Sequence, residues 1–382
     1  MKKRVLHVVN IFFTIPYFLG DQLRHFSNRN FEEHVVCSHS AELKDYSQKK
    51  GFEYKEVNIP REISPLKDLI AIYNTAKYIK KNKIDIVVGH TPKGALISMI
   101  ASYICRTKKR IYFRHGLAYE TSKGVKRKLL KLSEIVCSAL STEIINVSPS
   151  VAKKALEENI NKPEKQTILG KGTCNGISTE KFNRKNINNN DVKKIKLDLE
   201  IDENSIVLGF SGRLVKDKGI IELVNAFESL CKQRDNLTLL LVGMFEEKDK
   251  LPEDIIQKIK NSPNIKTTGY VSYEEIENYY AVMDIYILPS YREGFPTSIL
   301  EASSMGIPVI TSKSTGCIDS IINGKTGLFI NEINEFEIEK SIKQLLDNKT
   351  LMTDLGENGT QFVKKNFEQS YVWDAIEKIY KK

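Results

Sequence analysis

The strongest constraint on the fold is an alternation of short apolar runs with amphipathic stretches, which begins at the N-terminus of the 382-residue chain and later restarts. The first series predicts strands at Arg4–Asn10, Phe31–Cys37, Asp85–Gly89, Arg110–Arg114 and Ile144–Val147, with helices near Leu66–Asn82 and Gly94–Cys105. Strands that alternate with helices favour a parallel, doubly wound α/β sheet. The chain is too long for one ordinary α/β core, so two domains are expected.

A polar stretch at 182–191, FNRKNINNND, interrupts this series and is expected to link the domains. The pattern then restarts with strands at Ser205–Phe210, Leu237–Val242, Ile265–Thr268, Ile285–Leu288 and Pro308–Thr311. We therefore predict two Rossmann-like domains, 1–183 and 184–369, and a final helix over 370–382 that packs back on the first domain. Open α/β sheets bind ligands at the carboxyl ends of their strands, so candidate motifs are sought there.

The first candidate motif is the turn Gly209–Gly219, where a predicted strand meets a helix. Gly212 allows the backbone to approach a ligand closely. Arg213 and Lys218 place two cations beside a helix N-terminus, a combination that suits a diphosphate. Taken alone, the turn is equally consistent with two solvated surface cations.

The second candidate motif, SYREGFPTSILEA at 290–302, follows the predicted strand Ile285–Leu288. Glu293 stands in its Gly/Pro loop, and Glu301 follows on the next helix. Carboxylates accept hydrogen bonds from sugar and ribose hydroxyls, and the N–H groups of Gly294 and Phe295 are available to a sugar oxygen. An isolated glutamate pair is also consistent with a helix whose acidic residues suit its dipole. The occurrence of both motifs in one predicted domain favours a binding site.

Charge is divided unequally along the chain. Residues 1–190 hold 34 Lys+Arg and 17 Asp+Glu, a balance of +17, and the remainder holds 58−34 = 24 against 48−17 = 31, a balance of −7. The first half is therefore expected to meet an anionic membrane, nucleic acid or phosphorylated substrate. Its densest basic cluster consists of Lys123, Lys126, Arg127, Lys128 and Lys131, beside apolar residues at helical spacing, Val125, Leu129, Leu132, Val136 and Ala139. This basic amphipathic helix suits an anionic bilayer surface, and a helix packed on its apolar side is the alternative.

Other features indicate a cytoplasmic protein. The N-terminus lacks a signal-peptide pattern, and no stretch reaches the ~18 apolar residues of a spanning helix. The six cysteines are scattered without the spacing of a metal site or disulfide framework. A DxD-like metal pair is also absent, since Asp284 stands alone, so no metal is expected.

Residues 205–330 resemble the donor domain of family 4 glycosyltransferases, which are retaining enzymes of the GT-B fold with two Rossmann-like domains facing across a cleft. The likeness rests on both motifs and on GIPVITSKSTGCIDSIINGKTGLFI at 306–330. The first domain is similar to enzymes that extend lipid-linked bacterial surface glycans, through TIP at 14–16, REISPLKDL at 61–69, HTPK at 90–93, RHGL at 114–117, VSPS at 147–150 and LGKGTCNGI at 169–177. Two positions depart from the family pattern, because Thr14-Ile15-Pro16 replaces a frequent Gly pair and Ser178 replaces a frequent Asp.

The resemblance implies a role for each matching residue. Arg213 and Lys218 would bind the donor diphosphate in place of a metal, and Glu301 would bind the ribose. The donor site would comprise Gly212, Arg213, Lys218, Tyr270, Glu293, Gly294, Phe295, Pro296 and Glu301, with the Tyr270 backbone at the base and Glu293 and the Gly294–Phe295 backbone at the sugar. The catalytic set would be His115, Glu293, Arg213 and Lys218, and the acceptor contacts would be Thr14, Arg61, His90, Lys93 and Arg114.

The implied reaction moves a hexose or N-acetylhexosamine from a UDP-sugar to a polyprenyl-diphosphate-linked saccharide, without cofactor, at the inner face of the plasma membrane. A sugar-nucleotide epimerase or phosphorylase of the same fold is an alternative reading. A non-enzymatic, basic nucleic-acid-binding protein is another, although the cations are dispersed and no aromatic-rich RNA motif is visible. Structural hydrogen bonding remains the alternative role for His90 and His115, and solvation the alternative for Arg61 and Lys93.

Overall fold

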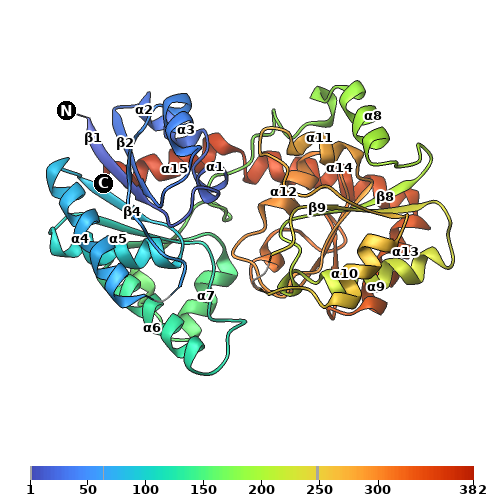
Figure 1. The fold of residues 1–382 in the computed structure, drawn as a ribbon. Coiled ribbons are helices and arrows are strands. Elements are labelled where there is room, and N and C mark those ends of the chain that lie inside the picture. The colour runs from blue at the N-terminus through green and yellow to red at the C-terminus, as the bar shows by residue number, and fades with distance from the viewer. Residues whose placement is uncertain (1, 63, 247–248) are drawn as a thin grey trace. The chain divides into compact units, whose positions relative to one another are not determined.

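The computed structural model describes residues 2–62, 64–246 and 249–382, which form two compact α/β units (Figure 1). The first unit runs to Gly176 and also contains Ser370–Lys382, and the second comprises Ile177–Gln369. Each unit is built around one parallel sheet with helices on its faces, so the predicted α/β class with two Rossmann-like sheets is confirmed.

The first unit has a seven-stranded sheet of order β3-β2-β1-β4-β5-β6-β7. Its strands are β1 Lys3–Val8, β2 Phe31–Cys37, β3 Glu53–Glu56, β4 Ile86–Gly89, β5 Lys109–Arg114, β6 Glu143–Asn146 and β7 Gln166–Ile168. Its helices are α1 Thr14–Phe18, α2 Gln22–Ser27, α3 Leu43–Lys50, α4 Pro65–Lys81, α5 Pro92–Ile104, α6 Gly124–Leu140, α7 Pro149–Glu157, the 3-10 turn η1 Pro163–Lys165 and α15 Gln369–Lys381.

The second unit has a six-stranded sheet of order β10-β9-β8-β11-β12-β13. Its strands are β8 Ile206–Ser211, β9 Leu237–Val242, β10 Ile265–Thr267, β11 Ile285–Leu288, β12 Val309–Ser312 and β13 Leu328–Ile330. Its helices are α8 Asn189–Asp198, α9 Ile220–Cys231, α10 Glu253–Asn261, α11 Ile276–Val282, α12 Thr297–Ser304, α13 Glu335–Leu346 and α14 Lys349–Asn366, with 3-10 turns η2 Arg184–Asn186, η3 Lys216–Lys218 and η4 Cys317–Asp319.

The central strands are buried on both faces, which explains their uninterrupted apolar sequences. Every residue of β9 is buried, as is every residue of β4 and β11. In both sheets the order of the strands reverses beside the first strand, between β1 and β4 and between β8 and β11. Such a reversal leaves a crevice at the carboxyl ends of the two strands, where α/β proteins bind ligands.

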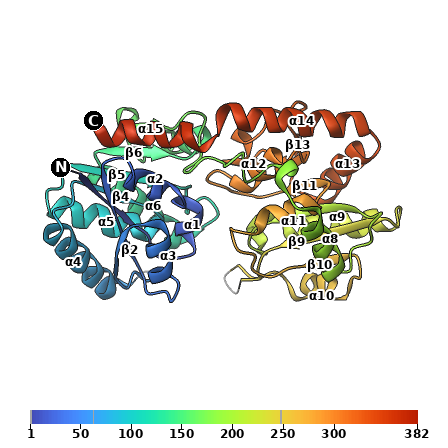
Figure 2. The same cartoon turned by 90° about the horizontal axis from the view of Figure 1, so that it is seen from above.

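The helix α15 belongs to the first unit (Figure 2). The Tyr380 ring packs against Phe26 and Phe31, with ring centroids 5.4 and 5.7 Å apart. Arg29 also pairs with Asp374 and Glu377 of the same helix. These contacts cover the α2 side of the first sheet with the last segment of the chain.

The chain passes from the first unit to the second before the expected boundary at 183. Ile177 already donates its N–H to the Phe367 carbonyl at 2.7 Å, and Phe182 is fully buried in the core of the second unit. The Asn-rich stretch 182–191 is therefore part of the second unit, in which the Asn183 and Asn188 side chains cap η2 and α8. Asparagine favours both linkers and caps, so the composition alone does not separate the two.

Candidate active site

The reversal point of the second sheet gathers the charged residues of both sequence motifs. Arg213 and Lys218 follow β8, and Glu293 follows β11, the strand beside it. Glu301 lies on α12, which begins after the same loop. Residues from two distant segments thus reach one edge of the sheet because the carboxyl ends of parallel strands point the same way.

Two glycines allow the loops at this edge to approach each other. Gly219 has φ +73°, and a Cβ there would collide with the Pro289 carbonyl at the end of β11. Gly243, with φ +143°, has no room for a Cβ beside the Gly212 carbonyl. The turn after β8 therefore touches the segments after both neighbouring strands, β9 and β11.

Arg213 and Lys218 each have a carboxylate partner. Lys218 forms an ion pair with Glu293, and both side chains are largely buried. Arg213 pairs with Glu246 at 3.0 Å and remains partly exposed. A third pair, Arg292 and Asp217 at 3.2 Å, joins the loops after β8 and β11, as the pair of Lys218 and Glu293 does. The site therefore holds its charges in opposed pairs at short range.

Glu301 is buried and accepts a hydrogen bond from the Tyr280 hydroxyl at 2.8 Å. Burial raises the pKa of Glu301 to about 7, and the Tyr280 hydrogen bond and the charge of Lys181 oppose that rise. The carboxyl group is thus close to half-ionised near neutral pH, when no ligand occupies the site. Its ionisation is poised to respond to a hydrogen-bonding ligand.

The loop that carries Glu293 is fixed from several sides. The Glu293 N–H donates to the Thr315 carbonyl at 2.9 Å. Ser290 Oγ donates to the Asp217 carbonyl at 3.1 Å, and Ser314 Oγ donates to the Ser290 carbonyl at 2.7 Å. Motif analysis did not single out these supporting residues, although the stretch TSKSTG at 311–316 is part of the family resemblance. They position the loop.

The rest of the expected donor set surrounds this loop. Gly294 follows Glu293, Phe295 packs against Phe367 with ring centroids 5.5 Å apart, and Pro296 occupies the N-cap of α12. Tyr270 follows Gly269, has an exposed side chain and lies after β10, two strands from β8. The second unit therefore brings Glu293 and Lys218 into direct contact and places Tyr270 at the same edge of the sheet.

In the first unit, the two histidines expected at the site, His90 and His115, lie in contact. His90 follows β4 and His115 follows β5, and His90 Nδ1 lies 2.9 Å from His115 Nε2. Two residues that the motifs did not reveal, His7 and Glu33, extend this contact into the sheet. A histidine within the apolar run VLHVV at 5–9 is the signal that was available in the sequence.

Comparison with known proteins identifies the family. Residues 191–362 match the family described as Glycosyl transferases group 1, and residues 4–148 match Glycosyl transferase 4-like. The Staphylococcus aureus protein named Capsular polysaccharide biosynthesis glycosyltransferase CapM is 34% identical over 379 residues, or 99% of this chain and 97% of that protein. The chain belongs to the group 1 glycosyltransferases.

Two further proteins place this glycosyltransferase among its relatives. It is 29% identical over 315 residues to the Escherichia coli UDP-Gal:alpha-D-GlcNAc-diphosphoundecaprenol alpha-1,3-galactosyltransferase, covering 82% of this chain and 77% of that one. The crystal structure of Anabaena Alr3699/HepE in complex with UDP and glucose has a TM-score of 0.84 at 17% identity and covers 99% of both chains. The glycosyltransferase therefore has the GT-B fold, as the family resemblance implied.

The expected acceptor residues of the glycosyltransferase lie in different environments. Thr14 begins α1 and donates to the Ile11 carbonyl at 2.8 Å, Lys93 forms an ion pair with Asp68, and Arg61 is exposed. In the motif that begins at Arg61, Ile63 lies outside the described residues.

Arg114 does not suit the expected contact with the acceptor. Its side chain is fully buried, and its guanidinium group donates to Glu134, Asn146, Asn161 and Ser138 at 2.7–3.1 Å. A cation at the end of a strand was expected to reach a ligand, but Glu134 on α6 pairs with it inside the unit. We assign Arg114 a structural role in place of the acceptor contact.

The basic helix of the glycosyltransferase, α6, turns its apolar side outward. Val125, Leu129 and Leu132 are exposed, the first at 73%, whereas the buried residues of α6 are Glu134, Cys137 and Ser138. Among the cations, Lys123, Lys126 and Lys128 are exposed, and Arg127 and Lys131 both pair with Glu158 at 3.1 Å. The alternative of a helix packed on its apolar side does not describe α6.

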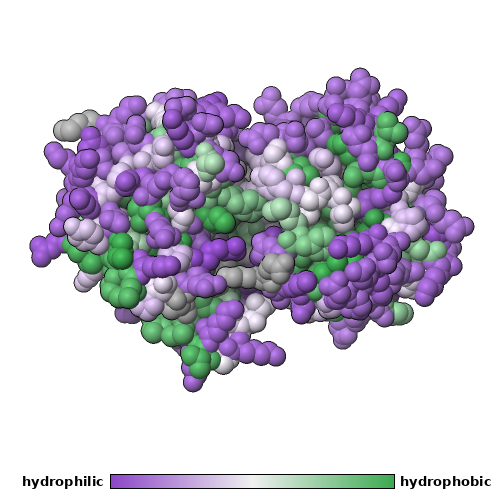
Figure 3. Space-filling view, in the orientation of Figure 1, coloured by the Kyte–Doolittle hydropathy of each residue, from purple (hydrophilic) through white to green (hydrophobic). Residues whose placement is uncertain are grey.

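The helix α4 exposes a second apolar stripe. Leu66, Leu69, Ile70 and Tyr73 are 61–78% exposed and recur at the spacing of one helical face. Helix α5 packs against both α4 and α6, so all three cover one side of the first sheet. Figure 3 shows hydrophobic side chains gathered at the lower left, over these helices. No helix in the described ranges is long and apolar enough to cross a bilayer.

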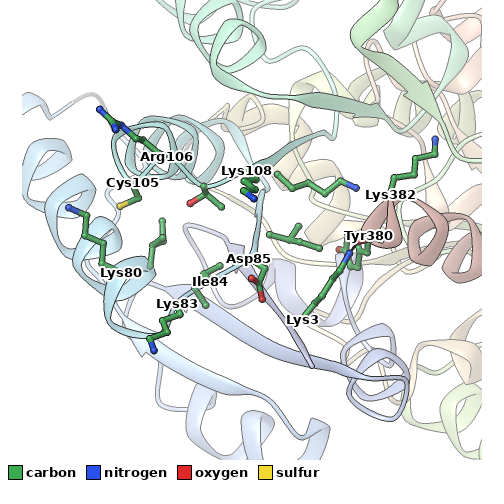
Figure 4. A pocket seen from close by; sticks show the side chains of 14 residues that line it. Lys3, Lys80, Lys83, Ile84, Asp85, Cys105, Arg106, Lys108, Tyr380 and Lys382 are labelled. Atoms are coloured by element: carbon green, nitrogen blue, oxygen red, sulfur yellow. Dashed lines mark hydrogen bonds between the residues drawn. The ribbon is translucent and has the colours of Figure 1, made fainter. Parts of the chain in front are cut away.

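A basic cavity of about 520 Å³ lies at the opposite edge of the first sheet, at the amino ends of β1, β4 and β5 (Figure 4). Lys3 Nζ donates to the Tyr380 carbonyl at 2.9 Å, and Lys109 Nζ donates to the Ile379 carbonyl. These carbonyls belong to the last turn of α15, which has no further backbone donors for them. The cations therefore anchor the terminal helix.

Across residues 2–62, 64–246 and 249–382, no group of three or more His, Cys, Asp or Glu side chains is arranged to hold a metal ion.

Proposed function

We propose that this glycosyltransferase moves a hexose or N-acetylhexosamine from a UDP-sugar to a polyprenyl-diphosphate-linked saccharide during synthesis of a bacterial surface polysaccharide, with retention of anomeric configuration. The observation that carries the proposal is the group of charged residues at the reversal point of the second sheet. Lys218 pairs there with Glu293 and Arg213 with Glu246, and the buried Glu301 accepts a hydrogen bond from Tyr280. The names of the Staphylococcus aureus and Escherichia coli relatives supply the capsular context and the diphosphoundecaprenol acceptor.

The charge pairs suit a diphosphate donor. Arg213 and Lys218 already face carboxylates, so they supply cationic hydrogen-bond donors without an uncompensated buried charge in the free enzyme. When phosphate oxygens of the donor replace Glu293 as the partner of Lys218, the Glu293 carboxylate becomes available to accept hydrogen bonds from the sugar hydroxyls. Stabilisation of the departing diphosphate by such fixed donors is the main catalytic contribution we assign to this unit.

Glu301 suits the nucleoside part of the donor. A buried carboxylate held by Tyr280 has a fixed orientation, and its oxygens are good acceptors for the paired hydroxyls of a ribose. The backbone at Tyr270 is assigned to the base, as the family resemblance implies. The second unit, from 177 to 369, is accordingly proposed to be the donor domain, and the first to be the acceptor domain.

The exposed stripes of α4 and α6 suit a membrane-bound acceptor. Apolar side chains flanked by Lys123, Lys126 and Lys128 match an anionic bilayer, in which the apolar groups enter the interface and the cations meet lipid phosphates. We therefore propose peripheral attachment to the inner face of the plasma membrane, where a polyprenyl-linked substrate is available.

The test is a panel of UDP-sugars incubated with a short polyprenyl-diphosphate saccharide. One donor is expected to release UDP in an acceptor-dependent manner, and the acceptor should gain the mass of a single sugar. Activity should persist in EDTA, because Arg213 and Lys218 are assigned the role of a metal. Release of UDP that is indifferent to every acceptor, or an interconversion of free UDP-sugars, would instead support an epimerase or hydrolase.

A further inference from the structure

The basic cavity at the amino ends of β1, β4 and β5 has an unequal balance of charge. Seven basic side chains line it, against a single acidic one, Asp85. The basic residues come from the start of β1, the end of α4, the segment 106–109 and the residue after α15 (Figure 4): Lys3, Lys80, Lys83, Arg106, Lys108, Lys109 and Lys382. All of these segments belong to the first unit, so the cavity is formed within that unit alone.

Two of the seven cations have partners inside the unit. Lys3 Nζ donates to the Tyr380 carbonyl at 2.9 Å, and Lys109 Nζ donates to the Ile379 carbonyl. Asp85 is also engaged, because its Oδ2 accepts from the backbone N–H of Arg4 at 2.8 Å. Among the residues that the structure describes, no carboxylate forms an ion pair with any of the other five cations: Lys80, Lys83, Arg106, Lys108 and Lys382.

Stabilisation of helix ends is the structural alternative for these cations. Helices α4, α5 and α15 all end at the cavity, and each C-terminus carries roughly half a negative charge. The three helix ends and Asp85 offset about 2.5 of the seven positive charges, and a free α-carboxylate at Lys382 would offset about one more. A surplus of about 3.5 positive charges remains, which is more than the helix ends neutralise.

Two of the unpaired cations stand where the backbone favours glycine. Lys83 follows α4 with φ +50°, and Arg106 follows α5 with φ +56°. Each is the residue just after the helix cap, where glycine is the usual residue because a Cβ is disfavoured at positive φ. Glycine would end both helices at a lower conformational cost. Helix termination therefore does not explain why a cation stands at the same position after two helices that pack together.

Lys109 shows the electrostatic effect of this crowding. Burial lowers the pKa of Lys109, the charge of Glu143 opposes this change, and the charges of Lys3 and Lys382 add to it. A negatively charged ligand in the cavity would relieve the repulsion among these cations. Phosphoryl oxygens suit such a place, because they accept charge-assisted hydrogen bonds from lysine and arginine in several directions.

We propose that this cavity binds an anion with two or more phosphoryl groups, at the edge of the first sheet opposite its carboxyl ends. Two phosphoryl groups supply the negative charge that the surplus requires, and a volume of about 520 Å³ lies within the range of small-molecule sites. A soluble polyphosphate and the two-phosphate headgroup of cardiolipin offer the same chemistry. The inference concerns the first unit alone and does not depend on the proposed glycosyl transfer.

Glycine variants remove the cations and preserve the backbone. Lys83→Gly and Arg106→Gly each delete one cation at a position whose φ suits glycine, so the variants should fold. The backbone control is Asn159→Gly, which changes an exposed, uncharged residue of the same unit with φ +54°. The charge control removes two exposed cations of α8 in the second unit, Lys193→Ala with Lys194→Ala.

Inorganic tripolyphosphate is the soluble probe. Calorimetry is performed with saturating UDP, so that the phosphate site proposed for the second unit is occupied. Each glycine variant should bind tripolyphosphate about tenfold more weakly than wild type, as expected for the loss of a hydrogen bond to a charged group, and the double variant about 100-fold more weakly. Binding should also raise the unfolding temperature, followed by the fluorescence of Trp373, the only tryptophan of the chain. Both controls should bind as wild type does.

Vesicles that contain cardiolipin are the second probe. They are tested in a background with Lys123, Lys126 and Lys128 changed to Glu, which removes attachment through α6. Vesicle binding that the double glycine variant loses and the α8 control keeps would assign the cavity to a lipid headgroup. Tripolyphosphate binding with the same pattern, and no vesicle binding, would assign it to a soluble anion. Binding of neither probe, an unchanged affinity in the double glycine variant, or an equal loss in the α8 control would overturn the proposal.

Discussion

The two units share a sheet order around their reversal points but fill these points with different chemistry. At β8 and β11 the second unit presents three ion pairs formed by loop residues. At β1 and β4 the first unit presents three histidine rings and one carboxyl group in an unbroken row of contacts from His115 to Glu33. The same strand order thus carries ion pairs between loops in the second unit and a row of histidine contacts within the sheet in the first.

The outer surfaces differ as well. The first unit carries apolar stripes on α4 and α6 that are largely exposed, together with most of the excess positive charge. A comparison of the units therefore separates two proposed tasks: donor binding in the second unit and membrane attachment on the helices of the first. Each of the following changes addresses one task and should leave the other intact.

The largest effect is expected at the fixed charges of the second unit. Arg213→Ala should lower kcat by roughly 10²–10³-fold, because a preorganised donor to the leaving diphosphate is lost. The matched control is Arg234→Ala, which removes an arginine paired with Asp347 in the same unit. Steady-state kinetics on both variants, with melting curves to verify folding, makes the measurement. Equal rates for Arg213→Ala and Arg234→Ala would remove Arg213 from the diphosphate site.

The next effect concerns the surface of the first unit. Reversing Lys123, Lys126 and Lys128 to Glu should weaken binding to anionic vesicles by at least about 10²-fold, since each cation contributes about 1 kcal/mol near such lipids. Salt should weaken wild-type binding, because the screening length is only about 8 Å at physiological ionic strength. Vesicle co-sedimentation measures both.

A control with the same change in charge separates local from overall electrostatics. Lys185, Lys193 and Lys194 are exposed cations of the second unit, and their reversal to Glu should preserve vesicle binding. Turnover of a water-soluble, short-chain acceptor should survive either triple change. If both triple variants lose vesicle binding to the same extent, attachment depends on the net charge of the protein and not on α6.

The third effect divides the two glutamates of the donor unit. Glu301→Gln should weaken UDP binding about 10- to 150-fold, the equivalent of 1.5–3 kcal/mol for hydrogen bonds to a charged group. Glu293→Gln should leave UDP affinity nearly unchanged and reduce transfer, because its assigned ligand is the sugar. Calorimetry with UDP tests the division, and equal losses of affinity in the two variants would refute it.

Much of the fold was accessible from the sequence, because buried parallel strands are continuous apolar runs. The strands Phe31–Cys37, Leu237–Val242 and Ile285–Leu288 have the predicted bounds. The stretch 182–191, which includes the first residues of α8, was mistaken for a linker, since its asparagine caps resemble a polar connection. The outward apolar face of α6 was one of two alternatives that the sequence left open, because spacing identifies an apolar side but does not say that Glu134 and Ser138 pack inward.

The site was accessible only where its residues follow strand ends. Lys218 and Glu293 stand in such loops, so their motifs were visible, although the ion pair between them depends on how close the two loops come. His7 and Glu33 lie within strands, where alternation places a side chain but does not reveal its partner. Arg114 stands at the end of a strand, where a ligand contact was expected, but its guanidinium group is buried and hydrogen-bonds Glu134, which lies twenty residues later in the sequence. The role of each of these side chains depends on a contact partner that is distant in the sequence.

The smallest effect is a dependence of UDP binding on pH, which tests whether the one buried carboxyl group assigned to the ribose changes its protonation when UDP binds. Because burial raises the pKa of Glu301 to about 7, the carboxyl group is mostly protonated at pH 6 and mostly ionised at pH 8. Only the ionised form accepts from both ribose hydroxyls, so UDP should bind roughly tenfold more weakly at pH 6 than at pH 8, as one titrating group near pH 7 requires. The terminal phosphate of UDP also titrates near pH 6, so Glu301→Gln serves as the reference that retains only this second contribution. Calorimetry across this range should show a steeper loss in wild type than in Glu301→Gln. Parallel pH profiles would mean that Glu301 does not change its protonation when UDP binds, and its proposed contact with the ribose would lose its support.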